Sequence, residues 1–305
     1  MGLERGRRKG VLIEEENGRT SPYSKGILAQ RLMVSGISRD KAYEIARKIE
    51  EKLTSKGVER IKQEKLQEII YETIKEEVGE EEADRYRLWI KIKRKKEPII
   101  ILLGGATGCG KSTIASELAY RLGIRHVVGT DAIREVMRRI LSKELMPFLH
   151  ESSYTAWRAI HVPIPPTYDE MIVGFEEHAK HVVVGIEAVL RRALVEGMNM
   201  IIEGVHIVPG FIKKEFTDLP NVIPIILYVE DSDEHKIRFY ARAQEAPFRK
   251  PVEEYIKDFE AIRRIQNYLV RQAEIYGVPA IKNESMEETV ERIIGIITER
   301  LKRLV

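Results

Sequence analysis

The residues with the clearest chemical meaning form one glycine-rich stretch, GGATGCGKST, at positions 104–113. From Gly105 onward it fits G-x-x-x-x-G-K-S/T, the pattern of a phosphate-binding loop, in which backbone N–H groups and a helix N-terminus point at a polyphosphate. Lys111 is expected to reach the β- and γ-phosphates, and the hydroxyl of Ser112 to bind Mg²⁺. On this basis the nucleotide-binding residues are Gly105, Gly108, Gly110, Lys111, Ser112 and Thr113.

An acidic residue further along the chain could act on the hydroxyl that receives a phosphate. Asp131 directly follows a short apolar segment at 126–129, where a strand would end. Phosphoryl transfer to a hydroxyl needs a carboxylate that orients the nucleophile or takes its proton. Asp131 is also a candidate ligand of Mg²⁺ beside Ser112, and the simpler interpretation is that it caps the following helix. Arg134, on the same helix face, suits a phosphate or carboxylate of the acceptor.

A second acidic residue, Glu203, ends another apolar segment at 200–203. Its carboxylate could hold Mg²⁺ through water or align the attacking hydroxyl, and it could equally cap a turn. The sequence leaves open whether Asp131 or Glu203 takes the proton. His206 is interpreted as a structural residue, because a lone histidine beside an apolar strand is more often a satisfied part of the interior than a catalytic group.

Three arginines lie between the last two segments that could form strands: Arg238, Arg242 and Arg249. Arg238 and Arg242 are four residues apart on a predicted helix, which Pro247 then ends. Such a segment could close over phosphates as a lid, expel water and neutralise charge that develops during transfer. We assign Arg238 to nucleotide binding, Arg242 to catalysis and Arg249 to the substrate. The alternative is a solvated basic helix face.

A further arginine, Arg158, lies in an aromatic and proline-rich stretch at 151–166. This stretch falls between the second and third predicted strands, where insertions often build a pocket at the edge of a sheet. Arg158 is therefore our second candidate for binding an anionic group of the acceptor. Trp157 beside it is interpreted as a core residue.

These side chains can meet only if a sheet brings them to one edge. Segments typical of buried strands lie at 99–103, 126–129, 200–203, 222–229 and 278–281, and helical segments separate them. This α/β alternation predicts a parallel five-stranded sheet flanked by helices, whose ligands gather at the carboxyl ends of the strands. The phosphate-binding loop and both candidate carboxylates fall at such ends.

The first part of the chain has a different pattern. We expect a small, mainly α-helical domain at 1–92, with a short strand near 11–13 and a hairpin at Asn17 and Gly18. A basic linker at 93–98 ends in proline, and the α/β domain occupies 99–305.

Composition limits the class of protein. The 305 residues include 51 basic and 48 acidic side chains, and a net charge of +3 does not indicate a nucleic-acid or membrane partner. One cysteine allows no intramolecular disulfide. The charged N-terminus, with no apolar core after it, lacks the pattern of a signal peptide, so we expect a cytoplasmic protein. Only 5 Asn and 6 Gln, among many Glu and Lys, are compatible with thermoadaptation.

Taken together, these segments resemble the archaeal 2-phosphoglycerate kinases over nearly the whole chain. The resemblance rests on the segments at 104–113, 130–134, 152–157, 202–206 and 259–266. The first domain resembles an ATP-cone, a small helical nucleotide-binding domain, through the short strand at 11–13, residues 22–25 and Tyr86. It departs from that pattern where basic residues usually follow the first strand, because Glu14, Glu15 and Glu16 occur there. This departure favours a structural or assembly role over nucleotide binding.

The resemblance implies a P-loop kinase domain, preceded by the ATP-cone, that transfers the γ-phosphate of ATP to the 3-hydroxyl of 2-phosphoglycerate. The product, 2,3-bisphosphoglycerate, feeds the synthesis of cyclic 2,3-diphosphoglycerate, a protective solute of archaea. ATP and Mg²⁺ or another divalent cation are the implied cofactors, although the loop alone does not rank ATP over GTP. The acceptor's carboxylate and phosphate fit a pocket with several arginines.

Two alternatives to this enzyme stay open at the level of sequence. One is a P-loop kinase for another small hydroxyl, a nucleoside or a polynucleotide end. The other is a nucleotide-gated ATP-cone regulator that binds DNA, although one cysteine excludes a zinc ribbon and no clustered basic helix stands out. A homo-oligomer is one of the states that the sequence allows.

Overall fold

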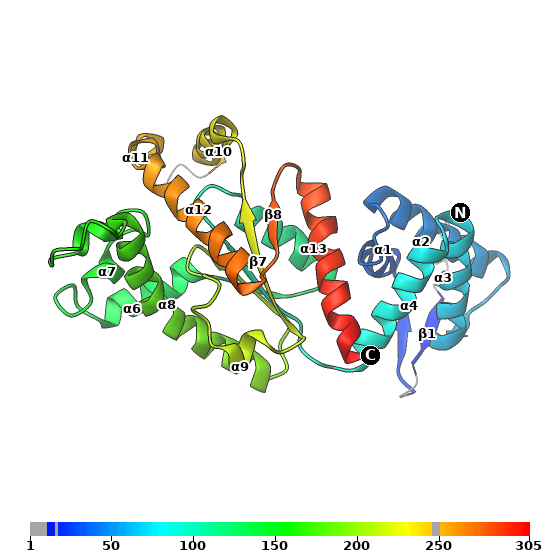
Figure 1. Ribbon diagram of the computed structural model, residues 1–305. Helices are drawn as coiled ribbons and strands as arrows, with labels where there is room; N and C mark the ends of the chain where they lie inside the picture. The colour runs from blue at the N-terminus through cyan, green and yellow to red at the C-terminus, as the bar shows by residue number, and fades with distance from the viewer. Residues whose placement is uncertain (1–10, 16–17, 246–250) are drawn as a thin grey trace, which may run out of the picture. The chain divides into compact units, whose positions relative to one another are not determined.

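The computed structural model describes residues 11–15, 18–245 and 251–305. The chain divides into two compact units (Figure 1). The main segment of the first unit ends at Lys95, and the second unit is formed by Lys96–Tyr120 and Ile124–Leu304. In the described part of the chain, no helix combines the length and apolar character that crossing a bilayer requires.

The first unit is a small three-stranded sheet with four helices. A hairpin in this part of the chain is confirmed, because β1 (Leu12–Glu14) pairs antiparallel with β2 (Thr20–Pro22), although Asn17 of the predicted turn lies outside the described residues. A third strand, β3 (Arg60–Lys62), pairs parallel with β1. It has only three residues, too short for a clear alternating pattern, and the sequence did not predict it. The helices are α1 (Lys25–Met33), α2 (Arg39–Ser55), α3 (Gln63–Glu77) and α4 (Glu80–Arg94).

Packing of helix faces holds this first unit together. Apolar residues recur along α2 with helical spacing, and Ile45 and Ile49 are fully buried in one core with Leu32 of α1 and Ile74 of α3.

Two charged stretches noted in the sequence have defined surroundings. In the acidic stretch, a carboxylate oxygen of Glu14 lies 3.8 Å from a guanidinium nitrogen of Arg60 on β3. Helix α4 continues through Arg94, so the start of the expected 93–98 linker is helical. Lysine and arginine are good helix formers, which explains the extension.

The second unit contains the predicted parallel sheet, with strand order β5-β6-β4-β7-β8. All four pairings between neighbouring strands are parallel. The strands are β4 (Ile100–Gly105), β5 (His126–Gly129), β6 (Met200–Gly204), β7 (Val222–Tyr228) and β8 (Ala280–Lys282). Each predicted strand is confirmed to within two residues at either end. The fold is therefore the expected α/β architecture.

Helices surround this sheet (Figure 1). Their bounds are α5 (Lys111–Leu122), α6 (Thr130–Ile140), α7 (Pro147–His150), α8 (Glu170–Val195), α9 (Lys214–Thr217), α10 (Ser232–Glu245), α11 (Val252–Lys257), α12 (Phe259–Tyr276) and α13 (Met286–Leu301), with short 3₁₀ turns at Ala156–Ala159 and Lys302–Leu304. The one long helix expected near 169–196 is α8.

The central strand β4 is buried on both faces. Ile100 and Leu102 join one apolar core with Ile202 of β6 and residues of α8. Ile101 and Leu103 point to the opposite face and are also fully buried. A strand that is covered on both sides must be apolar throughout, which is the pattern of the segment 99–103.

Burial of β4 predicts a large effect of truncation. Leu102→Ala is expected to lower the local unfolding free energy by about 2–5 kcal/mol, because the fully buried side chain leaves a cavity. Hydrogen exchange of the β4 amides measures this unit by itself. Val127→Ala on the edge strand β5 is the control, since Val127 is 43% exposed and should change the value by less than about 1 kcal/mol. Equal protection in both variants would contradict this account.

Candidate active site

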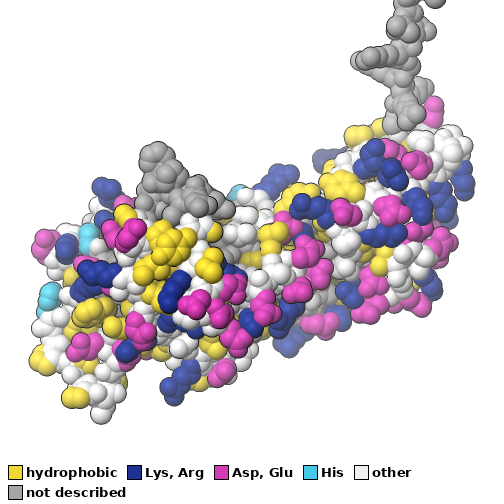
Figure 2. Space-filling view, turned by 90° about the horizontal axis from the view of Figure 1, so that it is seen from above, with side chains coloured by type: hydrophobic (Ala, Val, Ile, Leu, Met, Phe, Trp, Pro, Cys, Tyr) yellow, Lys and Arg dark blue, Asp and Glu magenta, His cyan; other side chains and the backbone are white. Residues whose placement is uncertain are grey.

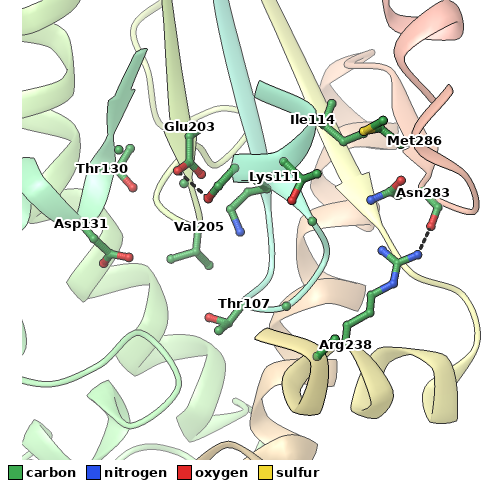
Figure 3. Close-up of a pocket in the computed structure, with 17 residues that line it drawn as sticks. Thr107, Lys111, Ile114, Thr130, Asp131, Glu203, Val205, Arg238, Asn283 and Met286 are labelled. Carbon is green, nitrogen blue, oxygen red and sulfur yellow. Dashed lines mark hydrogen bonds between the residues drawn. The ribbon is translucent and has the colours of Figure 1, made fainter. Parts of the chain in front are cut away.

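The carboxyl ends of β4, β5, β6 and β8 open onto one cavity of about 550 Å³ (Figure 3). Its walls are formed by Thr107, Gly108, Gly110, Lys111, Ser112, Thr113, Ile114, Gly129, Thr130, Asp131, Glu203, Gly204, Val205, Arg238, Ala241, Asn283 and Met286. Most candidate residues of the phosphate-binding loop, both candidate carboxylates and Arg238 thus share one space. Gly105 lies behind it, at the end of β4.

The loop between β4 and α5 needs glycine for steric reasons. Gly108 and Gly110 have φ angles of 85° and 89°, a region that side chains disfavour. A Cβ atom on Gly108 would lie 2.6 Å from the ring of Phe239, and one on Gly110 would lie 2.5 Å from the amide nitrogen of Asn283. The glycines therefore allow other side chains to approach the loop closely.

Side chains from distant segments hold the carbonyl groups of this loop. The Nε2 of His235 donates to the carbonyl oxygen of Thr107 (2.8 Å), and Nδ2 of Asn283 donates to that of Cys109 (2.8 Å). A guanidinium nitrogen of Arg238 approaches the same Cys109 oxygen at 3.3 Å. These hydrogen bonds hold the loop in its conformation without the need for a bound ligand.

Sequence reasoning missed His235 and Asn283 as part of the site. His235 lies three residues before Arg238 on α10, so the two share a helix face. Asn283 directly follows β8, at the same edge of the sheet as the loop. Two sequence signals could have found them. Asn283 lies just after a predicted strand, at the end where ligands gather, and His235 is three residues from Arg238 on a predicted helix.

Lys111 and Ser112 begin α5 and face the cavity. The ammonium group of Lys111 donates to the Ala106 carbonyl oxygen at 2.8 Å, which keeps the side chain folded along the loop (Figure 3). The hydroxyl of Ser112 donates to Oε1 of Glu203 at 2.9 Å. The end of β6 and the start of α5 are joined by this bond, although the two residues are 91 positions apart.

The donor set beside Ser112 fits a small divalent cation. A hydroxyl and a carboxylate are hard oxygen ligands of the kind that Mg²⁺ prefers, and kinases complete its coordination with substrate phosphates and water. Among the described residues, no three acidic, histidine or cysteine side chains cluster as a metal site of their own. The geometry pairs Ser112 with Glu203, whereas the sequence had paired it with Asp131.

Asp131 lies in the first turn of α6, and its side chain is 78% exposed toward the cavity (Figure 3). The residue at the N-cap position is Gly129, so Asp131 is not the cap of this helix. Its Oδ1 lies 3.6 Å from Nε of Arg134. Arg134 also donates to the carbonyl oxygens of Leu149 (3.3 Å) and Glu151 (2.6 Å), which fastens α7 to α6.

The other expected arginines have different surroundings. Arg238 lines the cavity and is bound by Glu234 and by the carbonyl oxygen of Asn283. Arg158 does not line the cavity and forms an ion pair with Asp258 at 2.8 Å. Arg242 belongs to α10, but its side chain lies outside the described residues, as does the whole of Arg249.

Buried histidines lie beside the cavity. His206 and His178 are fully buried, and their rings stack with centroids 4.9 Å apart. Burial lowers the pKa of His178 to about 4 and holds the pKa of His206 well below its usual value, to which the positive charges of Arg134 and Lys111 also contribute. Burial also lowers the pKa of His235 to about 4. All three are neutral at pH 7.

Basic and acidic side chains are intermixed on the face of the molecule shown in Figure 2. This agrees with the balanced composition of 51 basic and 48 acidic residues. This face therefore presents no broad area of a single charge sign.

The chain is similar to one domain family and to a set of curated proteins. Residues 11–95 match the ATP cone domain family. The chain is 51% identical to a 2-phosphoglycerate kinase of Methanopyrus kandleri, over 92% of this chain and 85% of that protein. It is 47% identical to a 2-phosphoglycerate kinase of Methanothermobacter thermautotrophicus, over 92% and 91% of the two chains. It is 42% identical to a 2-phosphoglycerate kinase of Thermococcus kodakarensis, over 96% of this chain and 99% of that protein.

The neutral buried histidines predict how stability depends on pH. Because their folded-state pKa values lie below the unfolded value of about 6.5, the unfolded chain binds more protons between pH 6.5 and 4. The unfolding free energy should therefore fall as the pH drops through this window, by at most about 1.4 kcal/mol per pH unit for each histidine.

Urea unfolding between pH 5 and 7 measures this slope. His235→Phe should reduce the slope, since it removes one such group, whereas Ile237→Ala is the control, because Ile237 is 63% exposed on the same helix and its change leaves all three buried histidines in place. Identical slopes in wild type and His235→Phe would show that His235 is not held neutral by burial.

Proposed function

This chain belongs to the family of archaeal 2-phosphoglycerate kinases, and we propose that it transfers the γ-phosphate of ATP to the 3-hydroxyl of 2-phosphoglycerate. The product is 2,3-bisphosphoglycerate, the precursor of cyclic 2,3-diphosphoglycerate. The observation that carries the proposal is one cavity that combines a phosphate-binding loop, the Ser112–Glu203 pair and the carboxylate of Asp131.

The cavity suggests how the nucleotide lies. Figure 3 has Thr130, Asp131 and Glu203 on one side of Lys111, and Arg238, Asn283 and Met286 on the other. With the phosphates on the loop and the start of α5, the nucleoside extends toward Arg238 and Met286, and the acceptor approaches from the side of Asp131. Arg238 is then a nucleotide-binding residue, as its sequence position suggested.

Ser112 and Glu203 are the residues that would hold a divalent cation, Mg²⁺ being the one expected with ATP. When bound, such a cation neutralises charge on the β- and γ-phosphates. Ser112 offers its hydroxyl oxygen, and the carboxylate of Glu203 lies beside it. Because Glu203 already accepts a hydrogen bond from the Ser112 hydroxyl, it is less suited than Asp131 to take a proton from the acceptor.

Asp131 is the proposed base. Its exposed carboxylate orients the 3-hydroxyl, whose oxygen forms a bond to the γ-phosphorus while the bond from phosphorus to the bridging oxygen of ADP breaks. The hydroxyl proton passes to Asp131, and the ammonium of Lys111 stabilises the charge on the transferred phosphoryl oxygens. We keep Arg134, Arg158 and Arg249 as proposals for binding the carboxylate and phosphate of the acceptor, and Arg242 as a proposed catalytic residue. Arg134 is the one that adjoins Asp131.

An acceptor-dependent assay tests the reaction. With Mg²⁺ and ATP, the purified chain should release ADP only when 2-phosphoglycerate is present. Lys111→Ala should reduce this release by at least about 100-fold, because the charge on the moving phosphoryl group loses its partner. Lys65→Ala is the matched control, since Lys65 is a surface residue of the first unit. Turnover with a nucleoside instead of 2-phosphoglycerate would overturn the proposed acceptor.

The two carboxylates should respond differently to neutral substitution. Asp131→Asn is expected to lower kcat by about 10²–10⁴-fold with little change in the KM for ATP, because a base is removed. Glu203→Gln should instead raise the Mg²⁺ concentration that gives half-maximal rate. Glu135→Gln, one turn along α6, is the control for Asp131. If kcat survives in Asp131→Asn and collapses in Glu203→Gln, their roles are exchanged.

A further inference from the structure

A row of buried polar groups begins at the wall of the cavity and runs inward. The hydroxyl of Thr130 lies 2.6 Å from Nδ1 of His206, and Nε2 of His206 lies 2.8 Å from Nε2 of His178. The row ends where Nδ1 of His178 meets the carbonyl oxygen of Phe148 at 2.7 Å. Thr130, His206 and His178 have no exposed surface. We call these four residues the Thr130–Phe148 row.

Only one arrangement of protons satisfies the row when both rings are neutral. The carbonyl oxygen of Phe148 can only accept, so His178 carries its proton on Nδ1 and accepts at Nε2. His206 must then donate from Nε2 and accept at Nδ1, and the hydroxyl of Thr130 donates to it. Every bond therefore points from the cavity wall toward α7.

The two ends of the row lie in two different helices, α6 and α7. Thr130 is the first residue of α6, directly before Asp131, while Phe148 lies in α7. Close packing at Gly204 adds to this: a Cβ atom there would lie 1.7 Å from the Thr130 hydroxyl. Since Gly204 follows Glu203, the row sets the start of α6 directly against the end of β6.

A stable core does not in general require buried polar groups. Replacing both partners of a buried hydrogen bond by apolar groups of the same shape can be nearly neutral for stability. Hydrogen bonds do, however, impose direction and distance, which apolar contacts do not. The row joins α6, the turn after β6, α8 and α7 in one fixed geometry, which points to a requirement for position.

We propose that His206 and His178 are positioning residues for phosphoryl transfer, which through Thr130 hold the first turn of α6 so that Asp131 faces the phosphate-binding loop. This inference rests on the proposed function. His178 does not line the cavity, so its effect on the reaction is transmitted through the row. In metal sites, mutation of residues that hydrogen-bond to the ligands typically lowers affinity or activity by about 10–100-fold.

Steady-state kinetics of variants at His178 test the role. His178→Phe keeps the ring volume and removes both hydrogen bonds, and kcat should fall about 10–100-fold with an unchanged KM for ATP. His178→Gln can still accept from His206, so it should recover a substantial part of kcat. His181→Phe is the control: His181 lies one turn along α8, its Nδ1 bonds the Glu177 carbonyl oxygen of its own helix, and a phenyl ring keeps the stacking of His181 on Phe148. A wild-type kcat in His178→Phe would overturn the proposal.

A spectroscopic measurement separates failure of the row from failure of the proposed acceptor. In ¹⁵N-histidine NMR of the ligand-free full chain, His178 should appear as the Nδ1–H form and His206 as the Nε2–H form. The backbone amide signal of Asp131 should shift in His178→Phe and stay in place in His181→Phe. The opposite ring forms, or an unmoved Asp131 signal, would overturn the row, whether or not 2-phosphoglycerate is the acceptor.

Discussion

The parallel alignment of the strands is the constraint on which the site depends. In this register Leu103 lies beside Glu203, and Glu203 lies beside Gly129, so three chain segments leave the sheet at the same level. The phosphate-binding loop, the Ser112–Glu203 pair and the start of α6 are consequences of that register. A slip of one residue would turn Glu203 to the other face of the sheet and separate it from Ser112.

Neutral hydrogen-bonding groups contribute much of the positioning of the reacting parts, and Arg238 adds a charged donor to the Cys109 carbonyl oxygen. His235 and Asn283 bind the carbonyl oxygens of the loop, and the Thr130–Phe148 row holds the start of α6. Neutral groups suit this task because a buried charge would be costly and would alter the field in the cavity. The charged groups that line the cavity, Lys111, Asp131, Glu203 and Arg238, thus remain directed at ligands or at the loop.

The arginines illustrate that one type of side chain can either bind an anionic ligand or hold parts of the protein together. Sequence position alone suggested anion binding for Arg134 and Arg158. In the structure Arg134 donates to two carbonyl oxygens near α7, and Arg158 pairs with Asp258 at the start of α12. A guanidinium has five donors, so bonding to the protein leaves capacity for a ligand, and both arginines stay candidates for the acceptor.

The sequence by itself determined the local features: the loop between strand and helix, the five apolar strands, the long helix α8 and the hairpin of the first unit. Each follows from residues that are neighbours in the chain, such as the glycines of the loop and the continuous apolar run of β4. Only the tertiary structure decided which side chains meet. Thr130 and His206 are 76 positions apart, and Cys109 and Asn283 are 174 apart. Their contacts depend on strand order and register, which no local pattern encodes. For this reason the sequence indicates only an isolated core residue at His206, whereas the folded chain places Thr130 and His178 within hydrogen-bond distance of it.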